Sequence, residues 1–315
     1  MNKNIFIVTG SSSMMGKATI AAIKKFYQDY EIVEVCRTTG FDLTMFGDSL
    51  NKLAPYYGKI AGLFHLAAFN GNVHMNIAQP ADFYYNNIKI GLNTLEIARQ
   101  LEVPKTVSII PSCSYPDSNN LLKEKDFLNG PSHPSVDSHG HARRVFFEYS
   151  KYLHKQYNFN SVCVVINNSF GIEDSFDEGK TKVIGGLIKR FIDAKLKNTP
   201  QVVVWGSGRP MREFIYCMDV GNALVRTFES YNDPTEVLNV GTGTDITIKD
   251  LAFLISEIIG YKGEIIFDTT KADGAIKKLM DNTKMKLVLN WEPEILLEDG
   301  IKQTVDWYYS NILGK

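Results

Sequence analysis

The sequence has few cysteines and lacks any long apolar run. Its cysteines, at Cys36, Cys113, Cys163 and Cys217, are too few and too far apart for a disulfide framework, so they indicate free thiols in a reducing compartment. The apolar run Ile5 to Val8 is too short for a signal-peptide core, and no other run approaches membrane-spanning length. We therefore expect a cytoplasmic protein that is neither exported nor inserted in a membrane.

Neither sign of charge is in excess. The chain carries 34 basic and 35 acidic residues, a formal net charge of -1, which leaves no surplus to neutralise a phosphate backbone or an anionic lipid surface. Nucleic acid and membranes are excluded as partners on this ground. His133, His139 and His141 lie close together, but no cysteine or carboxylate pattern completes a ligand set, so we expect no metal site.

Strand-length apolar runs alternate with helix-length amphipathic segments through the first half of the chain. The expected strands are Ile5 to Val8, Ile32 to Val35, Ile60 to Leu66, Thr106 to Ile110 and Ser161 to Ile166. The expected helices are Met14 to Tyr30, Ala81 to Leu101 and Ala142 to Tyr157. Strands separated by helices pair in parallel with right-handed crossovers, so the sequence predicts an α/β fold with a Rossmann-like, doubly wound parallel sheet.

The pattern changes after about residue 170. With 44% hydrophobic residues in 315, the chain can bury one large core and a smaller one. We expect a nucleotide-binding Rossmann domain over residues 1–170 that also receives about 214–242, and a smaller C-terminal α/β substrate-binding domain mainly in 171–315. Within the latter, Val202 to Cys217 predicts a strand, a Gly-Ser-Gly turn and a second strand with Arg212, where Trp205 offers a flat face to a base. A plain surface hairpin is the alternative.

A dinucleotide-binding loop is expected where Thr9-Gly10-Ser11-Ser12-Ser13-Met14-Met15-Gly16 joins the first strand to the first helix. Ser13 stands where the middle glycine of such a loop lets the backbone approach a pyrophosphate, which predicts weakened cofactor binding. Arg37, just past the second strand, is placed to hold a 2'-phosphate and favours NADP(H) over NAD. The expected cofactor-binding residues are Gly10, Ser13, Met14, Met15, Gly16, Arg37, Ala67, Ala68 and Arg143.

Two other interpretations of this loop are weaker. A P-loop would have one residue fewer between its glycines, and Ala18 stands where a Ser or Thr would hold magnesium after Lys17. A purely structural strand-to-helix turn ranks below nucleotide binding because of the position of Arg37.

Six motifs spread over nearly the whole chain carry a family resemblance. They are Pro111 to Pro116, Asn168 with Phe170-Gly171, Val183 to Phe191, WGSGRPMREF in the segment from Val202 to Val220, Asn239 to Gly243, and Tyr261 to Asp281. Together they resemble the GDP-L-fucose synthase family of extended short-chain dehydrogenase/reductases. The resemblance implies a GDP-4-keto-6-deoxymannose-type sugar that is epimerised at C3 and C5 and reduced at C4 with NADPH. It also implies substrate-binding roles for Asn168, Val183, Arg190, Trp205, Arg212 and Lys278.

The catalytic residues of that family are largely replaced. The family's Tyr-x-x-x-Lys pair is matched by His139 and Arg143, a supporting Ser or Thr by Pro111, and the epimerisation His by Lys182; Cys113 alone is kept. The candidate catalytic residues are Cys113, His139, Arg143 and Lys182. Tyr85 and Lys89 have the spacing of the pair, but they lie in another helix, so we interpret that match as coincidental.

The replaced set leaves two functions open. A His with an ordinary pKa near ~6.5 could donate a proton to a developing alkoxide, and Arg143 could grip the nicotinamide ribose. The first hypothesis is thus an NADP(H)-dependent reductase or epimerase of a GDP-linked keto sugar. The second is a catalytically silent GDP-sugar-binding homologue that acts as a regulator or as a partner subunit of an active paralogue. In that case Cys113 is an inert buried thiol, and His139 and His141 form a solvated loop end.

The resemblance also implies a homodimer. Its contact would use the expected helices Ala81 to Leu101 and Ala142 to Tyr157, because extended members of the family usually pair through them. The aromatic residues Phe146, Phe147, Tyr149 and Tyr152 suit such a face, although they could instead point to the sheet.

Overall fold

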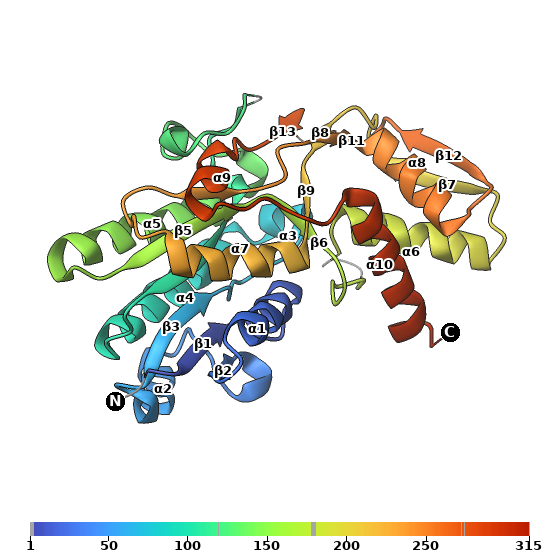
Figure 1. The fold of residues 1–315 in the computed structure, drawn as a ribbon. Helices are drawn as coiled ribbons and strands as arrows, with labels where there is room; N and C mark the ends of the chain where they lie inside the picture. The colour runs from blue at the N-terminus through green and yellow to red at the C-terminus, as the bar shows by residue number, and fades with distance from the viewer. Residues whose placement is uncertain (1–2, 119, 178–180, 272, 274, 315) are drawn as a thin grey trace.

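A computed structural model describes residues 3–118, 120–177, 181–271, 273 and 275–314. Its centre is a six-stranded sheet with the order β10-β5-β4-β3-β1-β2, and every neighbouring pair is parallel (Figure 1). The strands are β1 (Ile5–Thr9), β2 (Glu31–Val35), β3 (Ile60–His65), β4 (Thr106–Pro111), β5 (Ser161–Ile166) and β10 (Leu238–Val240). The predicted Rossmann-like doubly wound sheet is confirmed.

Helices cover both faces of this sheet. They are α1 (Met14–Phe26), α2 (Phe46–Leu53), α3 (Val73–Ala78), α4 (Pro80–Gln100), α5 (Asp137–Tyr157) and α7 (Cys217–Ser230). α1 packs against α7, and α4 packs against α5. Because side chains alternate along a strand, Phe6 of β1 enters one core with Ile23, while its neighbour Ile7 enters the opposite core with Phe146.

The end of α1 and the start of α5 differ from the sequence expectation by more than one residue. α1 ends at Phe26 rather than Tyr30, because Tyr27 leaves the helical conformation while its N–H still reaches Ile23 O. α5 begins at Asp137 rather than Ala142, after a 3-10 turn over Pro134–Val136 and with an acidic residue in its first turn. An acidic first turn is favourable beside the positive end of the helix dipole. His139 therefore lies in a helix and is buried, so its interpretation as a solvated loop end was wrong.

The C-terminal half forms a second lobe built from small sheets (Figure 1). β7 (Gln201–Trp205) pairs in parallel with β12 (Glu264–Asp268), while β8 (Met211–Arg212) lies between β11 (Ile246–Thr247) and β13 (Lys277–Lys278). These strands pack with α6 (Val183–Leu196), α8 (Ile248–Ile259) and α10 (Leu297–Asn311). The core of this lobe is separate and includes Phe191, Ile255 and Ile301.

The segment from Val202 to Cys217 is not a hairpin. Gly206 and Gly208 have φ values of 87° and 76°, and they turn the chain so that β7 and β8 join different sheets. Such left-handed conformations favour glycine. The predicted strand, turn and second strand with Arg212 are present, and only the alternative of a surface hairpin was wrong, since the partners of both strands come from residues beyond 245.

The chain returns to the first lobe after β8. β9 (Phe214–Tyr216) pairs with β6 (Asn168–Phe170), and α7 packs on α1. β10 then completes the main sheet. Later in the chain, α9 (Thr283–Leu289) packs beside β10. The exact domain boundaries stay a prediction. Among the helices that the structure describes, none has the length and apolarity needed to cross a bilayer.

Candidate active site

The loop between β1 and α1 fits a phosphate group. At Gly10, φ is 68° and a Cβ would lie 2.8 Å from Ala67 N; at Gly16 a Cβ would lie 2.2 Å from Gly10 O. Ser13 is the N-cap of α1: its Oγ accepts from Gly16 N at 3.0 Å and donates to Gly10 O at 2.8 Å. The Ser13 side chain is thus folded into the loop, and the helix N-terminus remains a suitable anion site. Weakened cofactor binding stays a prediction.

The other expected cofactor residues lie at the carboxyl ends of neighbouring strands. Arg37 begins a short 3-10 turn after β2 and is exposed, as a residue that meets a 2'-phosphate must be. Ala67 and Ala68 follow β3. Thr9 Oγ1 accepts from Ala67 N at 3.2 Å, and Ala67 O accepts from Arg143 Nη2 at 3.0 Å. The residues present therefore fit NADP(H) between β1, β2 and β3.

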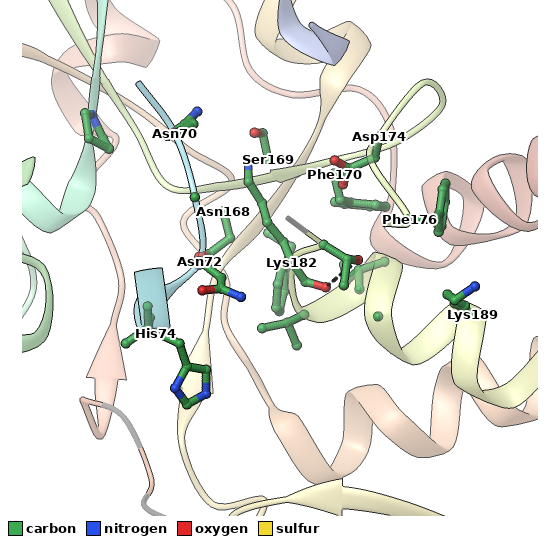
Figure 2. A pocket seen from close by; sticks show the side chains of 18 of the residues that line it. Asn70, Asn72, His74, Asn168, Ser169, Phe170, Asp174, Phe176, Lys182 and Lys189 are labelled. Carbon is green, nitrogen blue, oxygen red and sulfur yellow. Dashed lines mark hydrogen bonds between the residues drawn. The ribbon is translucent and has the colours of Figure 1, made fainter. Parts of the chain in front are cut away.

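A large cleft of about 1220 Å³ extends from the cofactor loop into the second lobe. Ten of the predicted site residues line it: Met15, Ala68, Cys113, His139, Arg143, Asn168, Lys182, Val183, Arg190 and Trp205. Figure 2 shows residues of its two walls, with Asn70, Asn72 and His74 facing Asp174 and Lys182. In the described part of the chain, the lining leaves out Gly10, Ser13, Met14, Gly16, Arg37, Ala67, Arg212 and Lys278.

His139 and Arg143 lie one turn apart on α5 and are almost inaccessible, at 8% and 3% exposure. Within the described residues, His139 Nε2 and the Nε and Nη1 of Arg143 have no hydrogen-bond partner. Burial, and then the charge of Arg143, lower the pKa of His139 to about 3. The expectation of a His with an ordinary pKa was therefore wrong, and the imidazole is neutral at pH 7.

Cys113 and Lys182 approach the cleft from different elements. Cys113 lies in the 3-10 turn Ser112–Ser114 after β4. Burial raises the pKa of its thiol, although the positive charges of Lys278 and Arg143 act to lower it. Lys182 precedes α6 and is exposed. Burial raises the pKa of Asp174, and the positive charge of Lys182 acts to lower it. At neutral pH the centre therefore holds a thiol, a neutral imidazole and a guanidinium.

Aromatic and basic side chains gather at the far end of the cleft. Arg190 of α6 donates through Nη1 to Val203 O at 3.0 Å, and its guanidinium lies 5.9 Å from the centre of the Trp205 ring. A neighbouring hollow of about 250 Å³ is lined by Arg190, Trp205 and Arg212. Burial lowers the pKa of Arg190 and of Arg212. Lys278 lies beside Arg212 because β13 pairs with β8 in that register.

The polar wall formed by Asn70, Asn72 and His74 was missed by the sequence analysis. His74 of α3 approaches Trp205 across the cleft, with ring centres 6.2 Å apart. Asn76 also lines the cleft and is buried, and its Oδ1 lacks a partner in the described residues. The asparagine-rich stretch 70–76 directly after a strand was the signal that could have revealed this wall.

Other candidates fall outside the cleft. Tyr85 is 60% exposed on α4, and Lys89 lies over its ring at 5.2 Å, so this pair is a surface feature. Phe146 and Phe147 are buried in the first lobe and point inward, whereas Tyr152 is exposed. All four cysteines are described and are free thiols. Across the described residues, no group of three or more His, Cys, Asp or Glu side chains has an arrangement that could hold a metal ion.

The fold and the two-lobed cleft define an extended short-chain dehydrogenase/reductase. Residues 6–241 match the NAD dependent epimerase/dehydratase family, and the chain belongs to that family. It is 33% identical to the putative GDP-L-fucose synthase 2 of Arabidopsis thaliana, over 98% of this chain and 92% of that protein. The predicted resemblance to GDP-L-fucose synthases is confirmed.

Solved structures extend the comparison. A GDP-6-OMe-4-keto-L-xylo-heptose reductase from Campylobacter jejuni has a TM-score of 0.88 at 26% identity, with 98% of this chain and 99% of the other covered. A GDP-L-fucose synthetase from Naegleria fowleri bound to NADP also has a TM-score of 0.88 at 26% identity, with 99% and 96% covered.

Proposed function

We propose that the protein is an NADP(H)-dependent reductase of a GDP-linked 4-keto sugar. The observation that carries the proposal is the large cleft, which joins the cofactor loop at Met15 and Ala68 to the basic and aromatic end at Arg190 and Trp205. A cofactor and a nucleotide sugar that enter from opposite ends would meet beside Arg143. Relatives in the comparisons that reduce GDP-linked keto sugars support this choice of substrate class.

The buried guanidinium of Arg143 is the main catalytic feature in this proposal. NADPH, when bound, supplies the hydride that adds to the carbonyl carbon. Negative charge then develops on the sugar oxygen, and Arg143 offers it a fixed positive charge and N–H donors in a site shielded from water. His139 is neutral and contributes hydrogen bonding rather than an imidazolium proton.

Cys113 supplies the proton that completes the reduction. Its thiol is protonated at neutral pH, because burial raises its pKa, yet a thiol is still far more acidic than the sugar alcohol that forms. The thiolate left behind regains a proton from water. The net reaction converts the ketone to an alcohol by adding one hydride and one proton.

Reduction is favoured over epimerisation by the protonation states of the centre. Epimerisation beside a ketone needs a base on one face of the sugar and an acid on the other. The raised pKa of Cys113 makes a thiolate base scarce, and a His139 with a pKa of about 3 is a very weak base. Lys182, in the position of the family's epimerisation His, is exposed at the start of α6.

A catalytically silent GDP-sugar-binding homologue, which regulates or pairs with an active paralogue, is the second candidate. The specific observation in its favour is the same low pKa of His139, which removes the expected proton donor from the position of the family's Tyr.

The test separates binding from turnover. Calorimetric titrations with GDP-mannose and with NADPH would be followed by an absorbance assay of NADPH oxidation with GDP-4-keto-6-deoxymannose. The reductase predicts binding of both ligands, and turnover that His139→Ala reduces and His141→Ala, at an exposed neighbour, leaves intact. Binding of the GDP-sugar with no NADPH binding or turnover would instead establish the silent homologue.

A further inference from the structure

Glu213 is a fully buried carboxylate, at 0% exposure, directly after Arg212. Its Oε1 accepts from Gly243 N at 2.7 Å and from Thr242 Oγ1 at 3.4 Å. Its Oε2 accepts from Asn167 Nδ2 at 3.0 Å and from Met280 N at 3.1 Å. Burial raises the pKa of Glu213, and these donors oppose the rise. A buried carboxylate is tolerated where donors replace its water shell, as they do here.

The donors belong to three segments that are far apart in the chain. Asn167 follows β5, Thr242 and Gly243 form the turn after β10, and Met280 follows β13. The backbone strengthens the same junction, because Glu213 N donates to Lys278 O at 3.3 Å and Asn167 Nδ2 donates to that oxygen at 3.2 Å. The carboxylate therefore ties β13 to the strand that carries Arg212.

This junction places two cations side by side. Lys278 of β13 is the register partner of Arg212 in β8. Burial lowers the pKa of Lys278, and the charge of Arg212 lowers it further. Like charges repel, and a strand of two residues has little stability of its own. The hydrogen bonds that the Glu213 carboxylate accepts, including the one from Met280 N, keep β13 in place beside β8. Two adjacent cations suit a diphosphate, which carries charge on both of its phosphate groups.

We infer that Glu213 is the positioning residue for the diphosphate of the nucleotide sugar. It holds Lys278 and Arg212 in the arrangement that binds this group and does not touch the ligand itself. The inference rests on the proposed function, which supplies the GDP-linked ligand.

Glu213→Gln is the first test. All the groups that bond to the two carboxylate oxygens are donors, so the amide NH₂ of Gln faces a donor wherever it points. We expect the affinity for GDP to fall about tenfold, as for loss of charge-assisted hydrogen bonds, while the affinities for guanosine and NADPH stay unchanged. A merely structural role would lower the melting temperature without this selectivity for the diphosphate.

Gly241→Ala provides an independent test that keeps the charge. A Cβ at Gly241 would lie 2.4 Å from Glu213 Oε1, so it displaces the carboxylate without neutralising it. We expect the same selective loss of GDP affinity. This variant decides the question if Glu213→Gln does not fold.

Asp219→Asn is the matched control. Asp219 lies in α7, away from β8 and β13, and is also a buried carboxylate, at 1% exposure. It accepts a hydrogen bond from Ile295 N at 2.9 Å. We expect a lower melting temperature and an unchanged affinity for GDP. Folded Glu213→Gln and Gly241→Ala proteins that bind GDP like the wild type would overturn the inference. A wild type that binds no GDP would instead overturn the proposed function, on which the inference rests.

Discussion

The nucleotide end of the cleft and its reacting centre hold their charges in different ways. In the nucleotide end, the cations already have backbone acceptors: Arg190 donates to Val203 O, and Arg212 Nη1 donates to Met211 O at 2.8 Å. At the reacting centre, Arg143 and His139 are more deeply buried, and three of their nitrogens lack partners within the described residues. The nucleotide end is thus preorganised, whereas the centre retains unused donors.

This difference indicates where a ligand is needed. A buried polar group without a partner costs about 1–3 kcal/mol, so such groups persist where a ligand supplies the missing partner. The motifs in the sequence predict that the nucleotide end keeps the residues of the GDP-L-fucose synthase family and that the centre departs from them. We therefore expect mutations at the reacting centre to change turnover and stability, and mutations at the nucleotide end to change the affinity for GDP.

Replacing Arg143 should have the largest effect. Arg143→Met keeps much of the volume but removes the buried charge, so we expect kcat for NADPH oxidation to fall about 10²–10³-fold, as for loss of a donor to a developing oxyanion. The same change should raise the free energy of unfolding by about 1 kcal/mol or more, because an unpaired buried charge is replaced by an apolar group.

Absorbance assays and denaturant unfolding would measure the two effects of Arg143→Met. The affinity for GDP, which reports on the nucleotide end of the cleft, should stay unchanged. Turnover equal to that of the wild type would remove Arg143 from the catalytic proposal.

Arg212→Met should break the nucleotide end without disturbing the centre. Loss of a charged hydrogen-bond donor, worth about 1.5–3 kcal/mol, corresponds to an affinity for GDP that is about 10- to 100-fold weaker. NADPH binding, measured by calorimetry, should not change. Equal weakening for both ligands would show that the two ends are not independent.

The pH dependence of stability should reveal the buried imidazole. His139 is neutral in both states above about pH 6.5, but between pH 6.5 and about 3 the unfolded chain takes up a proton that the folded chain does not. Its contribution should therefore lower the free energy of unfolding by about 1.4 kcal/mol per pH unit as the pH falls through this window.

Urea unfolding of the wild type, His139→Gln and His141→Gln at a series of pH values would isolate this contribution. The loss on acidification should be smaller for His139→Gln, while the exposed control at His141 should follow the wild type. Parallel curves for all three proteins would contradict a buried, neutral His139.

Ser13→Gly should have the smallest effect. Introducing the middle glycine of a typical dinucleotide-binding loop should tighten NADPH binding a few-fold if the side chain hinders the pyrophosphate. The loss of the Ser13 cap should cost only a few tenths of a kcal/mol. Calorimetry would measure the first effect and thermal unfolding the second. An unchanged affinity would mean that the inward rotation of the hydroxyl already provides the clearance.

Local patterns predicted the elements well but not their partners. The five strands of the first half were found almost residue by residue, because apolar runs alternate with amphipathic helices there. The two strands around Trp205 were also found, but the sequence did not show that each pairs with residues beyond 245 instead of with the other. The asparagine-rich wall at 70–76 was missed because a loop and a helix of six residues are too short to have a periodicity that indicates which side faces a cleft.

The sequence by itself determined the Rossmann-like sheet, the cofactor loop and the family resemblance, because these depend on residue types at short and regular spacing. The protonation of His139, the unpartnered donors of Arg143 and the four-donor site of Glu213 became visible only in the folded chain. Burial and hydrogen bonding set these properties, and both depend on segments that are far apart in the chain and meet only when it folds.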